Sequence, residues 1–292
     1  MNKIVALGFF DGVHLGHQAL LKECCRLARE QNAEACAITF AQHPQALFTD
    51  NPPRLINGLE SRTHLMKYYG IQRVMAYPVT RKVMSMSWQT FLNELTAAGA
   101  VGFVCGNDFR FGNRGGGNAE KLKTYCQERK LLCSIVEDQM LDGVRVSSTH
   151  IRSLLEEGNL EEAIRFMGHP HVLMGTVVSG RKIGHTIGAP TANINLPEAA
   201  AELPHGVYAC KAVADGKEYL AVTNIGSRPT VGGHQVRAET SLLDFDGDLY
   251  GRELLLQFYK FLRPERKFDS LEELREEIQK NIRQTRDFFE KR

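Results

Sequence analysis

The chain has 292 residues, enough for two domains of about 150 residues each, and a formal net charge of only +2 from 36 basic and 34 acidic side chains. This balance excludes a global field that would drive binding to nucleic acid or to an anionic membrane, so any phosphate recognition has to be local. Seven cysteines without a Cys-x-x-Cys pair fit neither a disulfide framework nor a zinc site, which indicates reduced thiols in a cytoplasmic protein.

Short apolar runs alternate with helical patterns in the first half of the chain. The first run is too short for a membrane span and has no small-residue cleavage site after it, so we expect a buried strand and not a signal peptide. Strands are expected at 3–9, 33–40, 73–79, 101–106 and 131–136, with helices at 15–31, 61–69, 88–97 and 120–129. This alternation predicts an α/β domain with a doubly wound parallel sheet, covered by helices on both faces.

Two short helices, 147–158 and 159–168, follow, and each begins at a capping residue and ends at glycine. Beyond residue 170 the pattern changes to strands separated by turns, with no helices between them. These strands are expected at 171–178, 206–214, 217–225, 236–245 and 249–262. The pattern predicts an antiparallel β-barrel, so we place one domain at 1–170 and a second at 171–292.

A terminal helix is expected after Ser270, which forms a capping box with Glu273. The face that packs on the barrel is expected to contain Leu271, Leu274, Ile278 and Ile282. An Asp-Gly step within 244–250 predicts a hairpin turn. That segment is not a calcium loop, because Leu249 and Leu255 stand where such a loop needs Gly and Glu.

The segment "GFFDGVHLGHQ" at 8–18 places two histidines where the first strand turns into the first helix. Their spacing puts His14 and His17 on one face of the opening helical turn, and Gly12 and Gly16 let a ligand approach the backbone. Free N–H groups at this position, at the carboxyl edge of a parallel sheet, predict a phosphate site. Two alternatives stay open on the motif alone: ordinary polar histidines, or a metal site, although zinc motifs on helices more often use i and i+4.

A second candidate site lies in "GAPTANI", at 188–194, where Thr191 and Asn193 offer oxygen ligands on the same side of an extended segment. Glu239 could supply a proton acceptor, or could instead form an ion pair with Arg237 or Arg252. The segment 175–182 has the glycine spacing of a Walker loop but lacks its Lys-Ser/Thr pair. We therefore expect 179–190 to form the phosphate cradle.

These segments resemble, in order and spacing, the bacterial bifunctional riboflavin kinase/FMN adenylyltransferases. The matches to the adenylyltransferase module are "GFFDGVHLGHQALL", "ITFAQHP", "GNDFRFG" and "VSSTHIRSLLEEG". The matches to the flavokinase module are "GTVVSG", "IGAPTANINLP", "NIGSRPTVGG" and "AETSLLDFDGDLYG". The resemblance covers nearly the whole chain, and it implies a cytoplasmic enzyme that phosphorylates riboflavin to FMN and adenylylates FMN to FAD, using ATP and Mg²⁺ at both sites.

The resemblance also implies residue roles. His14, His17 and Arg152 would stabilise the triphosphate during adenylyl transfer without a covalent enzyme intermediate, and Glu239 would take the proton from the 5′-hydroxyl of the ribityl chain. The nucleotide would contact Gly8, Phe9, Asp11, Gly12, His14, His17, Asp108, Ser148, Thr149, Arg152, Gly180, Lys182 and Gly184. The flavin would contact Phe109, Phe111, Glu239, Leu243 and Arg263, while Thr191 and Asn193 would hold Mg²⁺.

The chain departs from the usual family pattern at Asn107, at Ala189 and over residues 60–66, none of which carries an assigned role. Two rival functions remain: an enzyme with a single live site, and a flavin-binding or storage protein with relict catalytic residues. The partners implied are the small molecules riboflavin, FMN and ATP, with no nucleic acid or membrane and no prediction of an oligomeric state.

Overall fold

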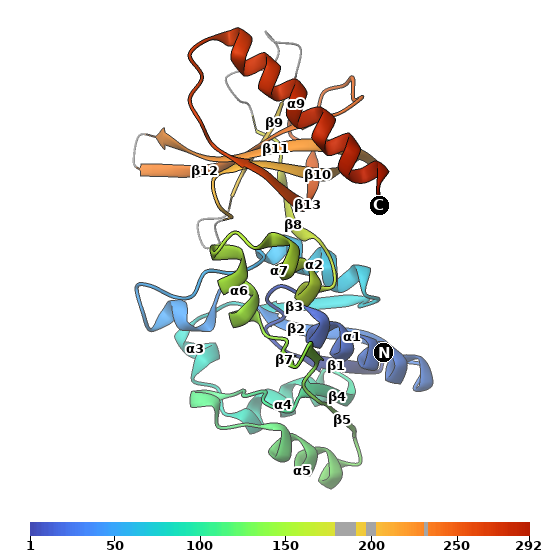
Figure 1. Cartoon of the computed structure of the whole chain (residues 1–292). Helices are drawn as coiled ribbons and strands as arrows, with labels where there is room; N and C mark the ends of the chain where they lie inside the picture. Colours follow the sequence, from blue (N-terminus) through green and yellow to red (C-terminus); the bar gives the residue numbers. More distant parts are fainter. Residues whose placement is uncertain (179–190, 197–202, 231–232) are drawn as a thin grey trace. The chain divides into compact units, whose positions relative to one another are not determined.

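A computed structural model of the chain describes residues 1–178, 191–196, 203–230 and 233–292 (Figure 1). The chain forms two compact units. The first contains Met1–Leu55 and Arg62–Ser148, and the second contains Ile56–Ser61 and Thr149–Arg292. The second unit therefore includes the helical pair that precedes residue 170, together with six residues from the first half of the chain.

The first unit is built on the parallel sheet that the sequence predicts, with strand order β3-β2-β1-β4-β5. Its strands are β1 (Lys3–Leu7), β2 (Glu34–Phe40), β3 (Arg73–Tyr77), β4 (Ala100–Gly106) and β5 (Leu132–Val136). Its helices are α1 (Leu15–Glu30), α2 (Leu59–Tyr68), α3 (Arg81–Met84), α4 (Trp88–Ala97) and α5 (Ala119–Arg129), with 3₁₀ turns at Pro44–Leu47 and Asn113–Gly115. A small hairpin, β6 (Met140–Leu141) and β7 (Val144–Arg145), precedes α6 (Ser148–Glu156) and α7 (Leu160–Met167).

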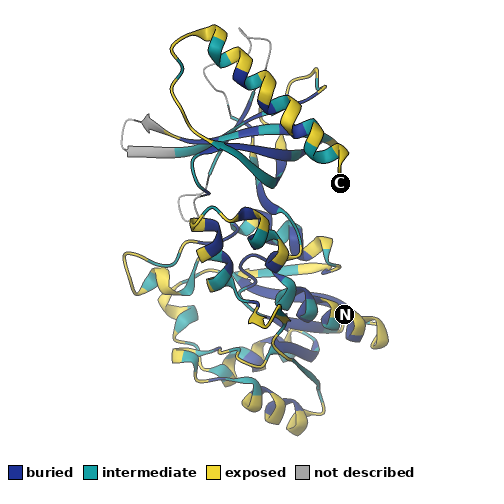
Figure 2. Ribbon diagram, viewed as in Figure 1, coloured by how far each residue is buried: buried dark blue, intermediate teal, exposed yellow. Residues whose placement is uncertain are grey.

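Helices cover both faces of this sheet. Val5 and Leu7 of β1 pack in one core cluster with Leu92 of α4 and Leu122 of α5. Helix α1 contributes nothing to that cluster but contacts β1, β2 and β4, so it covers the opposite face. The central strands β1, β2 and β4 are accordingly buried along most of their length (Figure 2), and the doubly wound prediction is confirmed.

The second unit is an antiparallel, nearly closed barrel with strand order β8-β13-β10-β11-β12-β9. Its strands are β8 (His171–Thr176), β9 (Ala192–Asn195), β10 (Gly206–Ala214), β11 (Lys217–Thr230), β12 (Gly233–Leu242) and β13 (Glu253–Pro264). Val178, just after β8, bridges to Asn193 in β9, which brings the two edge strands together. This arrangement confirms the predicted barrel, and it leaves few free strand edges.

The hairpin turn predicted within 244–250 is wrong. Strands β12 and β13 are separated in the sheet by β11 and β10, so the segment between them is a crossover and not a tight turn. Asp244 there has a left-handed φ of 59° and its two carboxylate oxygens each accept from Arg286 of α9 at 2.9 Å. The Asp-Gly hairpin of this unit is Asp215-Gly216, between β10 and β11, where both residues have positive φ.

The terminal helix α9 (Leu271–Glu290) contacts β10 and β11, as predicted, and Leu274, Ile278 and Ile282 of the expected face are partly buried. Leu271 is 66% exposed, whereas Glu277, Asn281 and Thr285 are buried. Glu277 is buried because it forms ion pairs with Arg263 at 3.4 Å and Arg266 at 2.8 Å, a pairing that apolar periodicity does not reveal.

All seven cysteines are free thiols. In the part of the chain that the structure describes, no helix is both long enough and apolar enough to cross a membrane.

Candidate functional sites

The first candidate site is the turn between β1 and α1. Gly12 has φ of 81°, and Phe10 and Val13 also have positive φ although both carry side chains. A β-branched residue in this region is strained, and such strain persists where the surrounding packing over-determines it. Phe10 and Val13 are fully buried, so the core holds the turn in this shape and presents the N-terminus of α1.

His14 is the N-cap of α1: its Nδ1 accepts a hydrogen bond from the backbone N–H of His17 at 3.3 Å. The two imidazoles are stacked, with centroids 3.6 Å apart and an interplanar angle of 14°. The Nδ1 atom of His17 is buried and has no hydrogen-bond partner. Burial, the stacked His14 and the guanidinium of Arg62 hold the pKa of His17 well below its usual value. These surroundings disfavour the protonated form of His17 in the free protein, and an arriving anion would favour it.

The start of α6 lies against this turn. Ser148 Oγ donates to the carbonyl oxygen of Asp11, which is almost fully buried, at 2.8 Å. The structure thus brings Gly8, Phe9, Asp11, Gly12, His14, His17 and Ser148 together in the first unit. Thr149 and Arg152 continue α6 in the second unit; Thr149 is exposed and Arg152 is partly buried.

An apolar cavity of about 180 Å³ adjoins Gly8 in the first unit. Phe109 and Phe111 both line it and stack on each other with centroids 5.6 Å apart at 15°, and Phe91 lies 5.9 Å from Phe111. The lining consists of Leu7, Gly8, Ile38, Phe40, Pro44, Tyr77, Val83, Met84, Met86, Phe91, Phe109, Arg110, Phe111, Gly112 and Gly115. Gly8 belongs to both the cavity and the histidine turn, so this arrangement suits a ligand with a planar aromatic end and a phosphate end.

Asp108 lies outside this cavity, with a side chain that is 64% exposed. Its carboxylate forms an ion pair with Arg145 of β7, which also pairs with Asp138 at 2.8 Å. No role was assigned to Arg145 from the sequence, although it opens the "RVSSTHIR" segment.

The second candidate site is a row of polar residues on neighbouring strands of the barrel. Asn193 of β9 lies directly opposite Glu239 of β12, and Glu239 lies opposite Asn224 of β11. Opposite residues of antiparallel strands project from the same face, so the three side chains are neighbours. Asn193 is 3% exposed and its Oδ1 has no hydrogen-bond partner. The ion pair of Glu239 with Arg252 is excluded, because Arg252 pairs with Asp215.

The sequence analysis did not single out two residues at this site, Asn224 and Glu265. Asn224 Nδ2 donates to Glu265 Oε1 at 3.0 Å, which places a second carboxylate beside the row. Asn224 stands in "NIGSRPTVGG", and the strand register brings it opposite Glu239; Glu265 stands in "LRPERKF" and is joined to this row through its bond with Asn224. The motifs alone gave no reason to single them out.

Thr191 lines a cavity of about 280 Å³ together with Phe245, Asp248 and Tyr250. Leu243, predicted to contact flavin, is buried, and its backbone N–H donates to the carbonyl oxygen of Leu220. Arg263 is held by Glu277 of α9 at 3.4 Å. Gly180, Lys182, Gly184 and Ala189 lie outside the described residues.

Thr191 and Asn193 have the chemistry to hold a magnesium ion. Across the described part of the chain no three His, Cys, Asp or Glu side chains form a metal cluster. Mg²⁺, however, takes only one or two oxygen ligands from many proteins and the rest from water and substrate phosphates. Thr191 and the orphaned Oδ1 of Asn193 are hard oxygen donors of that kind.

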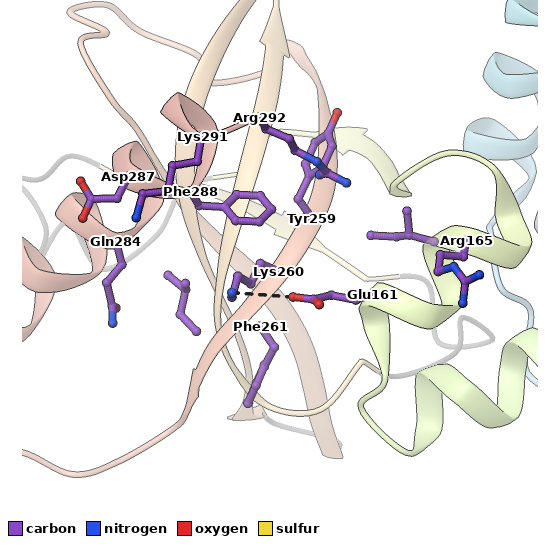
Figure 3. A pocket seen from close by; sticks show the side chains of 12 residues that line it. Glu161, Arg165, Tyr259, Lys260, Phe261, Gln284, Asp287, Phe288, Lys291 and Arg292 are labelled. Carbon is purple, nitrogen blue, oxygen red and sulfur yellow. Dashed lines mark ion pairs between the residues drawn. The ribbon is translucent and has the colours of Figure 1, made fainter.

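A larger groove of about 690 Å³ in the second unit contains none of the predicted site residues (Figure 3). Arg292 lies 5.3 Å above the rings of both Tyr259 and Phe288, and Lys260 lies 3.7 Å from Glu161. Cations at the C-terminal end of α9 stabilise the helix dipole there. These ring and ion-pair contacts give Arg292 and Lys260 a structural role in the groove.

Comparisons with known proteins match the whole chain. A family model described as FAD synthetase matches residues 1–150, and one described as riboflavin kinase matches 167–289. A relative from Listeria monocytogenes, named bifunctional riboflavin kinase/FMN adenylyltransferase, is 36% identical over 295 residues, which cover 100% of this chain and 94% of the relative. A relative of the same name from Bacillus subtilis is 34% identical, with 99% and 93% covered.

A solved structure has the same fold. A crystal structure described as a macrolide-efflux protein from Streptococcus pneumoniae superposes with a TM-score of 0.81 at 29% identity, and the match covers 98% of this chain and 94% of that one. Macrolide efflux is the description of that protein alone; the likeness shows the shared fold.

Proposed function

The chain belongs to the bifunctional riboflavin kinase/FMN adenylyltransferases, which phosphorylate riboflavin to FMN and adenylylate FMN to FAD with ATP, and we propose which of its residues carry each step. For adenylyl transfer, the observation that carries the proposal is that Gly8 lines the aromatic cavity and also begins the histidine turn. The isoalloxazine of FMN occupies the cavity against Phe109 and Phe111, and its phosphate extends towards His14 and His17.

In this arrangement an oxygen of the FMN phosphate attacks the α-phosphorus of ATP, the bond to the β-phosphate oxygen breaks, and pyrophosphate leaves. The N–H groups of α1, His14 and His17 stabilise the charge on the triphosphate, with Arg152 as a further cation. Gly12 permits a close backbone approach, and Phe9, Asp11, Ser148 and Thr149 complete the nucleotide contacts. Asp108 acts at the rim of this site together with Arg145. No covalent enzyme intermediate is needed.

For the kinase step, the carrying observation is the register that sets Glu239 opposite Asn193. Glu239 accepts the proton of the 5′-hydroxyl as that oxygen attacks the γ-phosphorus of ATP and ADP leaves. Bound Mg²⁺ would be held by Thr191 and Asn193 and would neutralise phosphate charge. Leu243 and Arg263 are proposed to contact the flavin. Gly180, Lys182 and Gly184 remain predicted phosphate contacts.

We further propose a cytoplasmic enzyme whose partners are small molecules. Seven free thiols support a reducing compartment, and the near-neutral charge offers no general attraction to nucleic acid or membranes.

A time course tests both activities. Purified protein is incubated with riboflavin, ATP and Mg²⁺, and riboflavin, FMN and FAD are separated by chromatography. We expect FMN to rise first and FAD to follow. FMN alone, or FAD only from supplied FMN, would indicate a single live site, and flavin bound without ATP turnover would indicate a storage protein.

A further inference from the structure

A completely buried arginine lies behind the histidine turn. Arg62 of α2 is 0% exposed. Its Nη1 donates to the carbonyl oxygen of Phe9 at 2.9 Å and to Thr39 Oγ1 at 3.3 Å, and its Nη2 donates to the carbonyl oxygen of Phe40 at 3.0 Å. Its Cζ also lies 4.6 Å from the centroid of the Phe9 ring.

These bonds join the carboxyl ends of two adjacent strands. Phe40 is the last residue of β2, and Phe9 follows β1 at the point where the chain enters the histidine turn. Thr39 Oγ1 donates to the same Phe9 carbonyl at 2.7 Å, so the backbone at Phe9 is held from two sides. Arg62 therefore fixes the direction in which the chain leaves the sheet towards His14.

The charge of Arg62 is not neutralised by a neighbouring carboxylate. Its hydrogen-bond acceptors are carbonyl and hydroxyl oxygens, it forms no ion pair with any described residue, and its Nε is buried without a partner. A buried charge is costly unless it is paired. Burial lowers the pKa of Arg62, and the more distant Asp11 only partly opposes this. An anion bound at the turn would supply the missing negative charge.

The field of Arg62 reaches the histidines. The charged and titratable groups that act on His17 are His14, stacked on it, and Arg62 behind it; both lower its pKa, in addition to burial. Asp11 attracts Arg62 from the same turn. Arg62 thus contributes a positive field at His17 before any ligand arrives, and Asp11 partly offsets it.

Resting on the adenylyl transfer proposed above, we infer that Arg62 is a positioning residue of that site. It fixes the carboxyl ends of β1 and β2 and places a buried positive charge behind the turn that receives the triphosphate. It does not touch the reacting atoms.

The test compares Arg62→Met, which removes the charge and the hydrogen bonds, with Arg62→Lys, which keeps the charge but cannot make all three bonds. Arg73→Met is the matched control, because Arg73 lies at the opposite edge of the same sheet, exposed and paired with Glu34 at 2.9 Å. FAD formation from supplied FMN gives kcat and the KM for ATP. NMR titration of the His17 imidazole in the free, full-length protein gives the pH at which His17 protonates, which reports the electrostatic field of Arg62.

We expect Arg62→Met to lower kcat by about 10²-fold, the scale of a misplaced catalytic group, and to raise the KM for ATP. His17 should protonate at a higher pH than in the parent. Arg62→Lys should give an intermediate kcat and the parent titration, and Arg73→Met should match the parent in every measurement. Riboflavin phosphorylation should be unchanged in all three.

A folded Arg62→Met variant with parent kinetics and the parent His17 titration would overturn the inference. Equal losses in the Met and Lys variants with no change in the titration would reduce Arg62 to a structural residue, and would overturn it as well. If Arg62→Met does not fold, an Arg62→Lys variant with the kinetics of the parent would also overturn the inference. Absence of FAD synthesis by the parent would refute the proposed function instead, and the titration would still test the field of Arg62.

Discussion

The imidazole of His14 accepts a hydrogen bond from the backbone N–H of His17, so the side chain assigned to triphosphate binding is also the N-cap of α1. A cap contributes about 1 kcal/mol to stability, and asparagine is as good a cap as any residue. Activity and stability can therefore be separated at this position by choice of the replacement.

We expect His14→Asn to keep the cap and lose the imidazole, and His14→Ala to lose both. Both variants should form FAD from FMN at least 10²-fold more slowly, because a group that stabilises transition-state charge is gone. Only His14→Ala should also unfold more easily, by about 1 kcal/mol in urea titrations followed by Trp88 fluorescence.

Asn118→Ala is the control for this comparison, since Asn118 caps α5 in the same unit, with Oδ1 accepting from the Lys121 N–H at 2.9 Å. It should lose stability and keep the parent rate of FAD synthesis. Near-parent FAD synthesis by His14→Asn would mean that His14 is only a helix cap.

Local pattern was sufficient for the parallel sheet of the first unit and for the antiparallel class of the second, although β9 was not among the expected strands. Each strand of the parallel sheet was predicted because its apolar run is short, bounded by turn residues and followed by a helical period. What local pattern could not supply is pairing over distance. The separation of β12 from β13, and the position of Asn193 opposite Glu239, 46 residues further along the chain, depend on strand register.

The sequence also did not reveal which charged side chains are buried. Arg62 stands among polar residues of a short helix, where an arginine is ordinarily exposed, and nothing in the sequence near it indicates that two strand ends will accept its hydrogen bonds. The burial of Glu277 in α9 could not be predicted from the sequence near it either. In both places the partners are carbonyl or guanidinium groups that reach the residue only after the tertiary fold is formed.

A pH dependence of stability is expected from His171, at the start of β8. The ring is buried against Phe258, its Nδ1 has no hydrogen-bond partner, and burial, with a smaller effect of His169, lowers its pKa to about 4. The unfolded chain binds this proton near pH 6.5, so the folded second unit loses stability as the pH falls from about 6.5 to 4, by up to about 3 kcal/mol.

Replacing the ring with an apolar side chain, in His171→Leu, should make the free energy of unfolding of the second unit less dependent on pH in this range. Urea titrations at several pH values, followed through methyl NMR signals of Leu254 and Leu256 in β13, measure the effect. Signals of Leu92 and Leu122 in the first unit serve as the internal control and should be unaffected. An equal loss of stability in the parent and the variant would show that His171 is not the group responsible.

Fragments test the predicted boundary at residue 170. A fragment of 171–292 should fold and convert riboflavin to FMN but not make FAD, because the barrel has its own core and terminal helix. The structure adds that α7 contacts β8 and β13, with Phe166 and Met167 buried. A fragment of 149–292 should therefore be more stable than 171–292 by about 3 kcal/mol or more, the scale of burying two large apolar side chains.

Chemical denaturation and kinase assays on the two fragments provide the comparison. An insoluble 171–292 fragment beside a folded 149–292 fragment would place the boundary before α6. Equal stability would show that α7 adds nothing to the core of the barrel.

The last prediction concerns Glu239, whose neighbours on both sides, Asn193 and Asn224, are neutral amides. Glu239→Gln keeps the size of the side chain and much of its hydrogen bonding while removing the negative charge and the proton acceptor. Riboflavin phosphorylation should fall by about 10²-fold or more, the usual consequence of removing a positioned general base. Supplied FMN should still become FAD at the parent rate, because that reaction is assigned to the site around His14 and His17.

Glu218→Gln is the matched control for this variant: Glu218 lies on the neighbouring strand β11, exposed and paired with Lys211 at 2.7 Å, so its loss should leave both rates unchanged. Collapse of the fold would abolish both activities, whereas loss of an ion pair alone would lower stability and spare turnover. A folded Glu239→Gln variant that still makes FMN at the parent rate would contradict the assignment. Asp244 is held by Arg286, so Asp246, and Asp248 in the cavity beside Thr191, would then be the carboxylates to replace.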